Sequence, residues 1–381
     1  MHDFIQRVVR QALHERRLVG VEVMVAHHGQ TRYHQAAGYA DRETQRPMTL
    51  NTRFRLASVS KPIVTTAAMV LVQQGKLHLD EAITRYLPDF TPPLPNGGQA
   101  TITLRQLMSH SAGLGYRFLE EDANGSYARA GVSDGMDASG VTLNENVRRI
   151  ATVPLLYAPG TAWCYSLAID VLGAVIEQVQ GQPLDVAIKT LVTGPLAMHN
   201  TAFALAPQQE VATAYVNDQP EPHRLQEGEF AAPFENTVGI CYSPSRVYNS
   251  QAYPSGGAGM VGTVGDMMRL LETLRSGGGS LLAPEWVAEM GRDQIAPHEL
   301  PDAPGVGFGL GFSVLRDPQL AASPESPGTW RWGGAYGHAW FVDQKQALSV
   351  VAFSNTLYEG MSGQFVNDLR DAVYHGLREA S

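Results

Sequence analysis

The stretch Ser58-Val59-Ser60-Lys61 places a possible nucleophile and a possible base three residues apart, at the start of an apolar segment. One helical turn brings side chains at this spacing onto the same face. A lysine accepts the proton of a serine hydroxyl only when its ammonium is held neutral, by burial or by nearby positive charge such as a helix N-terminus. The stretch therefore predicts a helix over residues 58–74 that carries a catalytic Ser58 and Lys61.

Chance is a poor explanation for this pair, because lysine is scarce in the chain. It occurs only at Lys61, Lys76, Lys189 and Lys345. At ordinary composition, about 0.2 accidental Ser-x-x-Lys pairs are expected for so few lysines. The motif is therefore treated as a signal for nucleophilic catalysis.

Composition excludes several classes of protein. The 381 residues are 44% hydrophobic and 17% charged, which is ordinary for a globular chain of about two domains. The net charge is −9 and no basic run occurs, so we expect neither a nucleic-acid partner nor an anionic membrane partner. No apolar run approaches the ~18 residues of a transmembrane helix. The oligomeric state is not determined by these features.

The N-terminal residues and the cysteines indicate a cytoplasmic protein. Residues 1–7 lead into an amphipathic stretch, without the apolar core and cleavage site of a secretory signal. The two cysteines, Cys164 and Cys241, give neither a disulfide framework nor a metal-binding spacing, which fits a reducing compartment.

The pattern of apolar residues predicts an α+β fold. Strands joined by short turns imply antiparallel pairing, and helices at both chain ends can cover the resulting sheet. We expect residues 1–76 and 238–381 to form this sheet domain, interrupted by a mostly helical, loop-rich domain over 77–237. The expected helices are 4–17, 58–74, 104–109, 145–150, 168–180, 266–274 and 365–377, and the expected strands are 19–26, 31–40, 308–315, 329–332, 339–343 and 347–353.

Two further segments carry possible chemistry. Tyr165 follows a Pro-Gly turn and precedes a predicted helix, so its phenol can reach a cleft and relay the serine proton beside a lysine. The commoner alternative is a half-buried loop tyrosine. Trp332-Gly333-Gly334-Ala335 is a β-like run ending in paired glycines, where a substrate could lie against exposed backbone. Taken alone, it would be an ordinary turn.

Together these residues resemble the penicillin-recognising serine enzymes, which include class C β-lactamases, DD-peptidases and family VIII carboxylesterases. Ser58-x-x-Lys61, Tyr165 and Trp332-Gly333-Gly334 stand in the order and spacing of that family's three motifs. Residues 53–58, 107–114 and 255–261 also look like family signatures, so the likeness covers nearly the whole chain. It implies the β-lactamase/DD-peptidase-like fold, an antiparallel sheet flanked by helices beside a helical domain, with the site in the cleft between them.

Departures from the family's motifs indicate its esterase branch. The tyrosine motif of lactamases is Tyr-x-Asn, whereas here it is Tyr165-Ser166-Leu167; the lysine that begins their third motif is replaced by Trp332. Two groups that recognise a polar, peptide-like substrate have become apolar, which favours an apolar ester over a charged amide. The pattern is similar to family VIII carboxylesterases of the EstB type.

The resemblance implies a mechanism on a small-molecule ester, with no metal and no cofactor. Ser58 attacks the ester carbonyl, and Lys61 and Tyr165 accept and return protons; which of the two is the acylation base stays open. The backbone N–H groups of Ser58 and Ala335 form the oxyanion hole. The expected substrate-binding residues are Leu167, Trp332, Gly333 and Gly334.

Competing motifs are weaker. Gly131-Val132-Ser133-Asp134-Gly135 matches the nucleophile elbow of α/β-hydrolases, with His338 and Asp343 as nominal triad partners, but its flanks fit neither the strand nor the helix which that elbow needs. Gly257-x-Gly259-x-x-Gly262 matches a dinucleotide fingerprint without a surrounding βαβ unit. His27-His28 lacks the spacing of metal ligands.

Three rival functions stay open on the same sequence. The first is β-lactam or D-amino-acid peptide hydrolysis, which Leu167 and Trp332 disfavour. The second is acyl transfer to an alcohol, which nothing in the sequence excludes. The third is a binding protein without activity, which the intact Ser58, Lys61 and Tyr165 disfavour. The leading hypothesis is a serine carboxylesterase for short- to medium-chain apolar esters.

Overall fold

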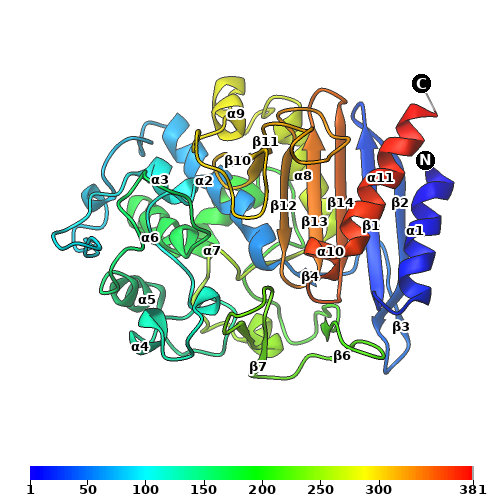
Figure 1. Cartoon of the computed structure of the whole chain (residues 1–381), viewed down its shortest axis with the longest axis horizontal. Helices are drawn as coiled ribbons and strands as arrows, with labels where there is room; N and C mark the ends of the chain where they lie inside the picture. The colour runs from blue at the N-terminus through cyan, green and yellow to red at the C-terminus, as the bar shows by residue number, and fades with distance from the viewer. Residues whose placement is uncertain (380–381) are drawn as a thin grey trace.

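An antiparallel sheet of eight strands forms the centre of one half of the molecule, in a computed structural model that describes residues 1–379 (Figure 1). The strand order is β10-β11-β12-β13-β14-β1-β2-β3, and each neighbouring pair is antiparallel. This sheet, with helices around it, confirms the expected α+β class. Its strands are β1 (Gly20–His27), β2 (Gln30–Asp41), β3 (Arg46–Pro47), β10 (Val306–Phe308), β11 (Ser313–Leu315), β12 (Trp330–Gly334), β13 (His338–Asp343) and β14 (Leu348–Ser354).

The two ends of the chain meet in the middle of this sheet. β1 pairs with β14 from Val21 opposite Ser354 to His27 opposite Leu348, and it pairs with β2 on its other side. Segments more than 300 residues apart in sequence are therefore hydrogen-bonded neighbours. The division into a domain of 1–76 with 238–381 and a domain of 77–237 stays a prediction.

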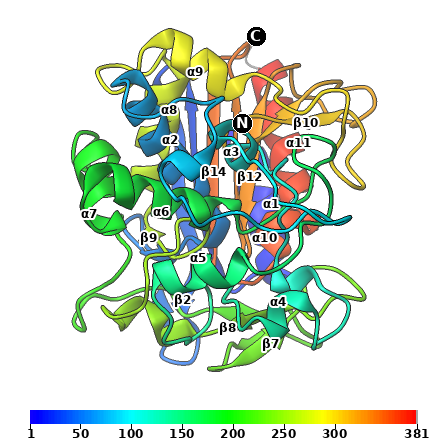
Figure 2. The same ribbon diagram turned by 90° about the vertical axis from the view of Figure 1, so that its left-hand side faces the viewer.

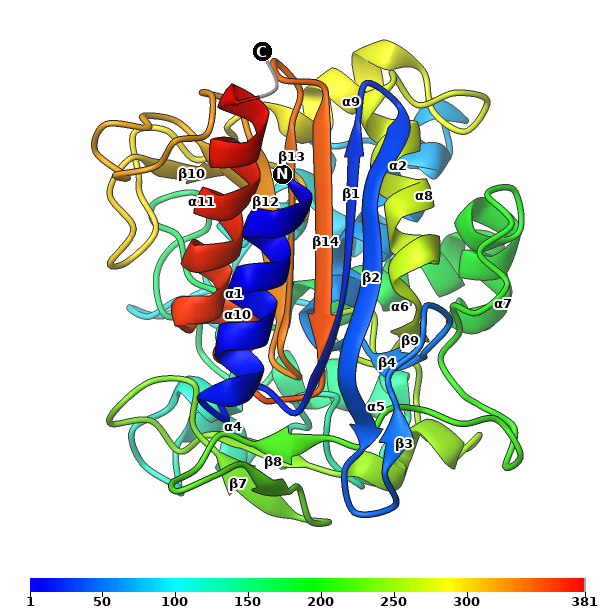
Figure 3. The ribbon, with the colours of Figure 1, turned by 90° about the vertical axis from the view of Figure 1, so that its right-hand side faces the viewer.

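Helices cover both faces of the sheet. α1 (His2–His14) and α11 (Gln364–Arg378) lie side by side across one face (Figure 3). Val21, Val23 and Val25 alternate along β1 and are buried in one cluster with residues of these two helices. α8 (Val264–Arg275) packs against β1 and β14 on the opposite face. The predicted helices at both chain ends and at 266–274 are thus confirmed.

The other half of the molecule is built largely from helices and long loops (Figure 2). α2 (Ser60–Gln73) is its centre: every residue from Ser60 to Val72 is buried, and the helix packs against α6. α2 therefore holds its first turn in a fixed place. In the two halves together, the remaining α-helices are α3 (Leu104–Met108), α4 (Ser126–Arg129), α5 (Leu143–Ile150), α6 (Ala168–Gln180), α7 (Leu184–Ile188), α9 (Pro284–Gly291) and α10 (Glu359–Ser362), the last of which packs on the sheet. The remaining strands form short pairs: β4 (Phe54–Arg55) with β9 (Val261–Gly262), β5 (Tyr215–Val216) with β6 (His223–Arg224) and β7 (Glu229–Ala231) with β8 (Ile240–Tyr242).

One predicted strand is wrong. Residues 308–315 were expected to form a single strand, but they contain the turn of a hairpin between β10 and β11. The chain reverses at Gly311, which has a φ of +106°, and the Gly309 amide donates to the Phe312 carbonyl oxygen at 2.8 Å. A Cβ on Gly311 would lie 2.2 Å from Thr65 Oγ1 in α2, so only glycine permits this reversal against the central helix.

Some features are not found within residues 1–379. None of the helices there combines the length and apolar character needed to cross a membrane. No group of three or more His, Cys, Asp or Glu side chains in this part of the chain is arranged to hold a metal ion. Cys164 and Cys241 are both free thiols.

Candidate active site

Ser58 lies in a short turn between a strand and the central helix. β4 pairs with β9 directly before this turn, and the residues Ala57–Val59 form one turn of 3-10 helix. Ala57 adopts a φ of +46°, a conformation that is uncommon for a residue with a side chain. Regular α-helix begins only at Ser60, two residues later than predicted. Ser58 thus stands at the electropositive N-terminal end of α2.

Lys61 lies in the first turn of α2, with its side chain fully buried. Its Nζ is 3.2 Å from Ser58 Oγ, 2.9 Å from Tyr116 Oη and 2.8 Å from the carbonyl oxygen of Gly257. Burial lowers the pKa of the Lys61 ammonium to about 7, although nearby carboxylates oppose this effect. Near neutral pH, a substantial fraction of Lys61 is therefore the free amine.

Tyr165 reaches the same point from the loop that precedes α6. Its phenol makes a short hydrogen bond with Ser58 Oγ, across 107 residues of sequence. Lys61 Nζ lies 4.5 Å from the centre of the Tyr165 ring. Burial raises the pKa of the Tyr165 phenol, so this group is protonated in the folded protein at neutral pH. The structure thus brings Ser58, Lys61 and Tyr165 into mutual contact.

The segment Trp332-Gly333-Gly334 ends β12 and packs against the turn that carries Ser58. A Cβ on Gly334 would lie 2.4 Å from the Leu56 carbonyl oxygen, which is closer than any side chain permits. Ala335 follows directly and is buried. β12 therefore delivers the Ala335 backbone to the neighbourhood of Ser58.

Aromatic side chains form a wall beside the Tyr165 phenol. Trp332 packs against Tyr165 and Phe308, with ring centres 5.3 Å and 5.1 Å apart. Trp163 stacks on Tyr165 at 6.5 Å and contacts Phe308 at 5.4 Å. Packing of an apolar group on these side chains is favourable because it removes apolar area from water, whereas a charged group would lose its hydration there.

Leu167 is placed differently from the prediction. It was expected to contact substrate, but its side chain is 0% exposed and belongs to the main hydrophobic core. Its amide donates to the Gly115 carbonyl oxygen at 3.0 Å, which fixes the loop between Tyr165 and α6. Packing in the core stabilises this leucine, so it offers no surface to a ligand in this structure.

Three residues at the site were not predicted. Tyr116 and Gly257 contact Lys61 directly, and Asp170 accepts a hydrogen bond from the Gly257 amide at 2.7 Å. Gly257 lies in a family-like signature, and this was the available signal for it. Tyr116 and Asp170 had none, because their contacts join segments that are distant in sequence.

The alternative nucleophile Ser133 is not part of a triad. Its hydroxyl donates to Asp137 Oδ1 at 2.6 Å. His338 donates from Nε2 to the Arg55 carbonyl oxygen at 2.7 Å, and Asp343 lies at the opposite end of β13 from His338. The nominal partners thus belong to separate networks, and Ser133 follows α4 rather than a strand.

The glycine pattern Gly257-x-Gly259-x-x-Gly262 is not a dinucleotide site. It runs into β9, which pairs antiparallel with β4, whereas the fingerprint requires a strand before the glycines within a parallel βαβ unit. Its first glycine instead lies beside Lys61. The pattern therefore contributes to the Ser58 site.

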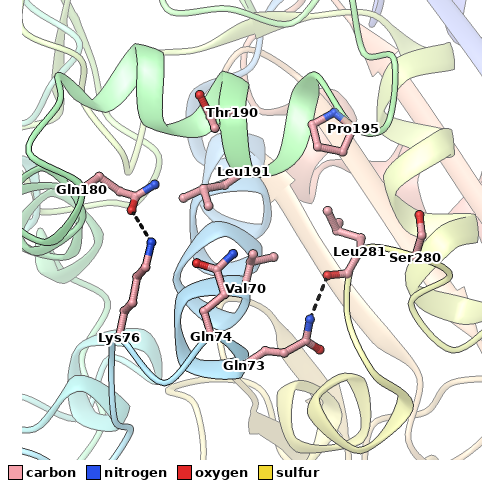
Figure 4. Close-up of a pocket in the computed structure, with 10 residues that line it drawn as sticks. All are labelled: Val70, Gln73, Gln74, Lys76, Gln180, Thr190, Leu191, Pro195, Ser280 and Leu281. Atoms are coloured by element: carbon pink, nitrogen blue, oxygen red, sulfur yellow. Dashed lines mark hydrogen bonds between the residues drawn. The ribbon is translucent and has the colours of Figure 1, made fainter.

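A pocket of about 370 Å³ lies at the other end of α2 (Figure 4). Gln73, Gln74 and Lys76 line it, and Lys76 Nζ lies 3.4 Å from Gln180 Oε1. With a rise of 1.5 Å per residue, the helix separates this pocket from Ser58 by about 20 Å. It lacks a paired nucleophile and base, so it is not a second candidate for the reaction centre.

Comparison with known proteins gives a consistent result. The family model described as beta-lactamase matches residues 5–375. Esterase EstB of Burkholderia gladioli is 48% identical over 372 residues, covering 97% of this chain and 94% of that protein. The solved structure of EstCE1, a hydrolase with promiscuous acyltransferase activity, is 47% identical with a TM-score of 0.95 and covers 98% of both chains. Simvastatin synthase (LovD) from Aspergillus terreus, 22% identical with a TM-score of 0.78 and 98% of both chains covered, shares the fold.

Proposed function

The chain belongs to the beta-lactamase family, and on that premise we propose that it is a serine carboxylesterase that forms an acyl-enzyme on Ser58. The observation that carries this proposal is the mutual contact of Ser58, Lys61 and Tyr165 beside an apolar wall. Both a named esterase and a hydrolase, at 48% and 47% identity, support it.

Lys61 takes the proton from Ser58 in this proposal. A neutral amine has two N–H groups and one lone pair, and Lys61 has three neighbours: the Gly257 carbonyl oxygen, the Tyr116 hydroxyl and Ser58 Oγ. The carbonyl oxygen can only accept, and Tyr116 accepts the second N–H, so the lone pair faces Ser58. The lowered pKa of Lys61, about 7, supplies the free amine that this step needs.

Tyr165 then carries the proton to the departing alcohol. Its raised pKa keeps it a phenol, which can donate to the alcohol oxygen. Tyr165 then regains the proton that Lys61 took from Ser58, by way of the Tyr116 hydroxyl that contacts both groups. The backbone N–H groups of Ser58 and Ala335 stabilise the oxyanion of the tetrahedral intermediate. Water attacks the acyl-enzyme by the reverse proton path and releases the acid.

The substrates are short- to medium-chain apolar esters. Trp332, Gly333 and Gly334 border the reacting carbonyl, and Trp163 extends the apolar surface on which an acyl or alcohol group packs. Phe308 is fully buried and supports both tryptophan rings from behind. Leu167 acts indirectly, by holding the Tyr165 loop. A charged β-lactam gains no cation from Trp332, so we propose weak or no cephalosporin hydrolysis.

The experiment compares hydrolysis of a p-nitrophenyl ester series and a chromogenic cephalosporin by the wild type, Ser58→Ala and Ser133→Ala proteins. We expect rapid turnover of short and medium esters, little turnover of the cephalosporin, and loss of activity in Ser58→Ala alone. A better rate with the cephalosporin would overturn the esterase assignment. Loss of activity in Ser133→Ala, with activity kept in Ser58→Ala, would overturn the assignment of the nucleophile.

Acyl transfer is a second candidate activity, because EstCE1 is described as a hydrolase with promiscuous acyltransferase activity. An alcohol that packs on the aromatic wall competes with water for the acyl-enzyme. Adding a primary alcohol to a vinyl ester reaction in water and measuring the ratio of new ester to free acid tests this. A product mixture of acid alone at high alcohol concentration would contradict it.

We propose the cytoplasm as the compartment in which the enzyme acts. The free thiols of Cys164 and Cys241 fit a reducing environment. Fractionation of cells that produce the chain from its own gene, with esterase activity as the readout, tests this; activity in the secreted fraction would contradict it.

A further inference from the structure

A buried carboxylate lies close to Lys61 without touching it. Asp170, in the first turn of α6, is 1% exposed and accepts three hydrogen bonds. The donors are the Gly257 amide at 2.7 Å, the Ser255 hydroxyl at 2.7 Å and the Tyr253 hydroxyl at 3.2 Å. Burial raises the pKa of this carboxyl, whereas the three donors and the neighbouring Lys61 ammonium favour its ionised form.

Gly257 connects this carboxylate to the lysine. Its N–H binds Asp170, and its carbonyl oxygen accepts from Lys61 Nζ at 2.8 Å. A Cβ on Gly257 would lie 3.1 Å from Asp170 Oδ1, 3.2 Å from Tyr116 Oη and 3.5 Å from Lys61 Nζ. Asp170, Tyr116 and Lys61 therefore meet at the position that a side chain on residue 257 would occupy, and a glycine leaves this position free.

We propose that Asp170 is a positioning residue for Lys61. Its carboxylate fixes the Gly257 peptide that binds the lysine, and it places a negative charge beside the ammonium, so it sets the pH at which Lys61 becomes a free amine. This inference rests on the proposed role of Lys61 as the base.

The other titratable groups around the lysine do not replace this charge. Tyr116 and Tyr165 are phenols whose pKa burial raises, and burial lowers the pKa of His110 well below its ordinary range, so these three are neutral. Asp134 also acts on the lysine, and burial raises the pKa of its carboxyl to about 7, so it is partly ionised at neutral pH. Burial raises the pKa of Asp170 as well, but Asp170 accepts from three donors where Asp134 accepts from two. Asp170 is the larger of the two carboxylate influences.

The variant Asp170→Asn separates charge from shape. The asparagine oxygen can still accept from the Gly257 amide, whereas the negative charge is lost. A negative charge favours the ammonium, so its removal lowers the pKa of Lys61 and the free amine persists to lower pH. A neighbouring charge in a protein interior shifts a pKa by about one unit or more.

The test is the pH dependence of kcat/KM for p-nitrophenyl butyrate, followed in a pH-stat. In Asp170→Asn, we expect the acid limb to move to lower pH by about one unit or more. Asp343→Asn is the matched control: Asp343 is fully buried and accepts from the Ser326 amide, the Gln346 amide and the Tyr374 hydroxyl, at the end of β13 away from the site. Its acid limb should not move.

Ser255→Ala keeps the inference testable if Asp170→Asn does not fold. It removes one donor to the carboxylate, which raises the pKa of Asp170 and weakens its charge, so a smaller shift in the same direction is expected. An unchanged acid limb in a folded Asp170→Asn or, failing that, in Ser255→Ala would overturn the role of Asp170. Lys61→Ala distinguishes the two proposals. Full activity in that variant would overturn the role of Lys61 as the base, and not only the role of Asp170 in positioning it.

Discussion

In the proposed mechanism, a single proton on Lys61 decides whether Ser58 can react. Burial at the N-terminal end of α2 opposes the ammonium, while Asp170 and Asp134 favour it. The balance leaves the lysine close to half protonated at neutral pH. At the scale of the residue, the proposed activity therefore depends on the protonation state of one amine, which is held in a fixed geometry.

This balance gives a direct prediction for pH. In the proposed mechanism the free amine is the active form, so kcat/KM should rise with pH and reach half its plateau near pH 7, the pKa of Lys61. Initial rates with p-nitrophenyl butyrate between pH 5 and pH 9, at constant ionic strength, measure it. A rate that stays on its plateau at pH 5 would show that the base is not Lys61.

Gly334 gives the second prediction at this scale. In Gly334→Ala the new Cβ would lie 2.4 Å from the Leu56 carbonyl oxygen, so β12 and the Ser58 turn must separate and the oxyanion hole must open. Loss of one such donor reduces kcat by about 10²-fold or more. Gly140→Ala is the control, because a Cβ on Gly140 meets nothing within 4 Å. Equal kcat values in the two variants would contradict this account.

At the scale of the element, α8 has a side-chain cap at its N-terminus. The Thr263 hydroxyl accepts from the Asp266 amide at 3.2 Å, as the spacing of the two residues indicates. Thr263→Ala should lower the free energy of unfolding by about 1 kcal/mol, measured by urea denaturation. Thr263→Ser keeps the acceptor oxygen and should cost only a few tenths of that amount. Equal losses in both variants would show that packing of the methyl group, not capping, dominates.

Elements were predicted well where one local pattern decides them. The helical spacing of apolar residues located α1, α6, α8 and α11, and β-like runs next to short turns located β1, β2, β13 and β14. The stretch 308–315 failed because its apolar residues suit a strand, whereas Gly311 reverses the chain against Thr65 of α2. That neighbour lies about 250 residues earlier, beyond the reach of any local pattern.

Prediction of the site shows the same division. Ser58 and Lys61 lie together as one helical turn predicts, and Tyr165 and Trp332, which family motifs mark, lie beside them. Tyr116 and Asp170 escaped, since only tertiary contacts bring them to Lys61. Leu167 was expected to contact substrate, but its side chain is buried in the hydrophobic core, where packing is more favourable than exposure.

At the scale of the whole molecule, the chain ends hold the sheet together. α1 packs on α11 and on the sheet, and Ile5 of α1 is fully buried in one cluster with residues of β1 and α11. Ile5→Ala should lower the free energy of unfolding by about 2–5 kcal/mol. Gln11→Ala, on the exposed face of the same helix, should change it by less than about 0.5 kcal/mol. Equal effects would mean that α1 contributes little to the stability of the sheet.

The whole fold serves to bring one serine, one lysine and one tyrosine together from separate elements. The most direct measurement of this claim is covalent labelling with a fluorophosphonate, followed by digestion and mass spectrometry of the modified peptide. The account predicts one modified residue, Ser58, with labelling strongly slowed in Lys61→Ala. Label on Ser133, or no label on an enzyme that hydrolyses esters, would contradict it.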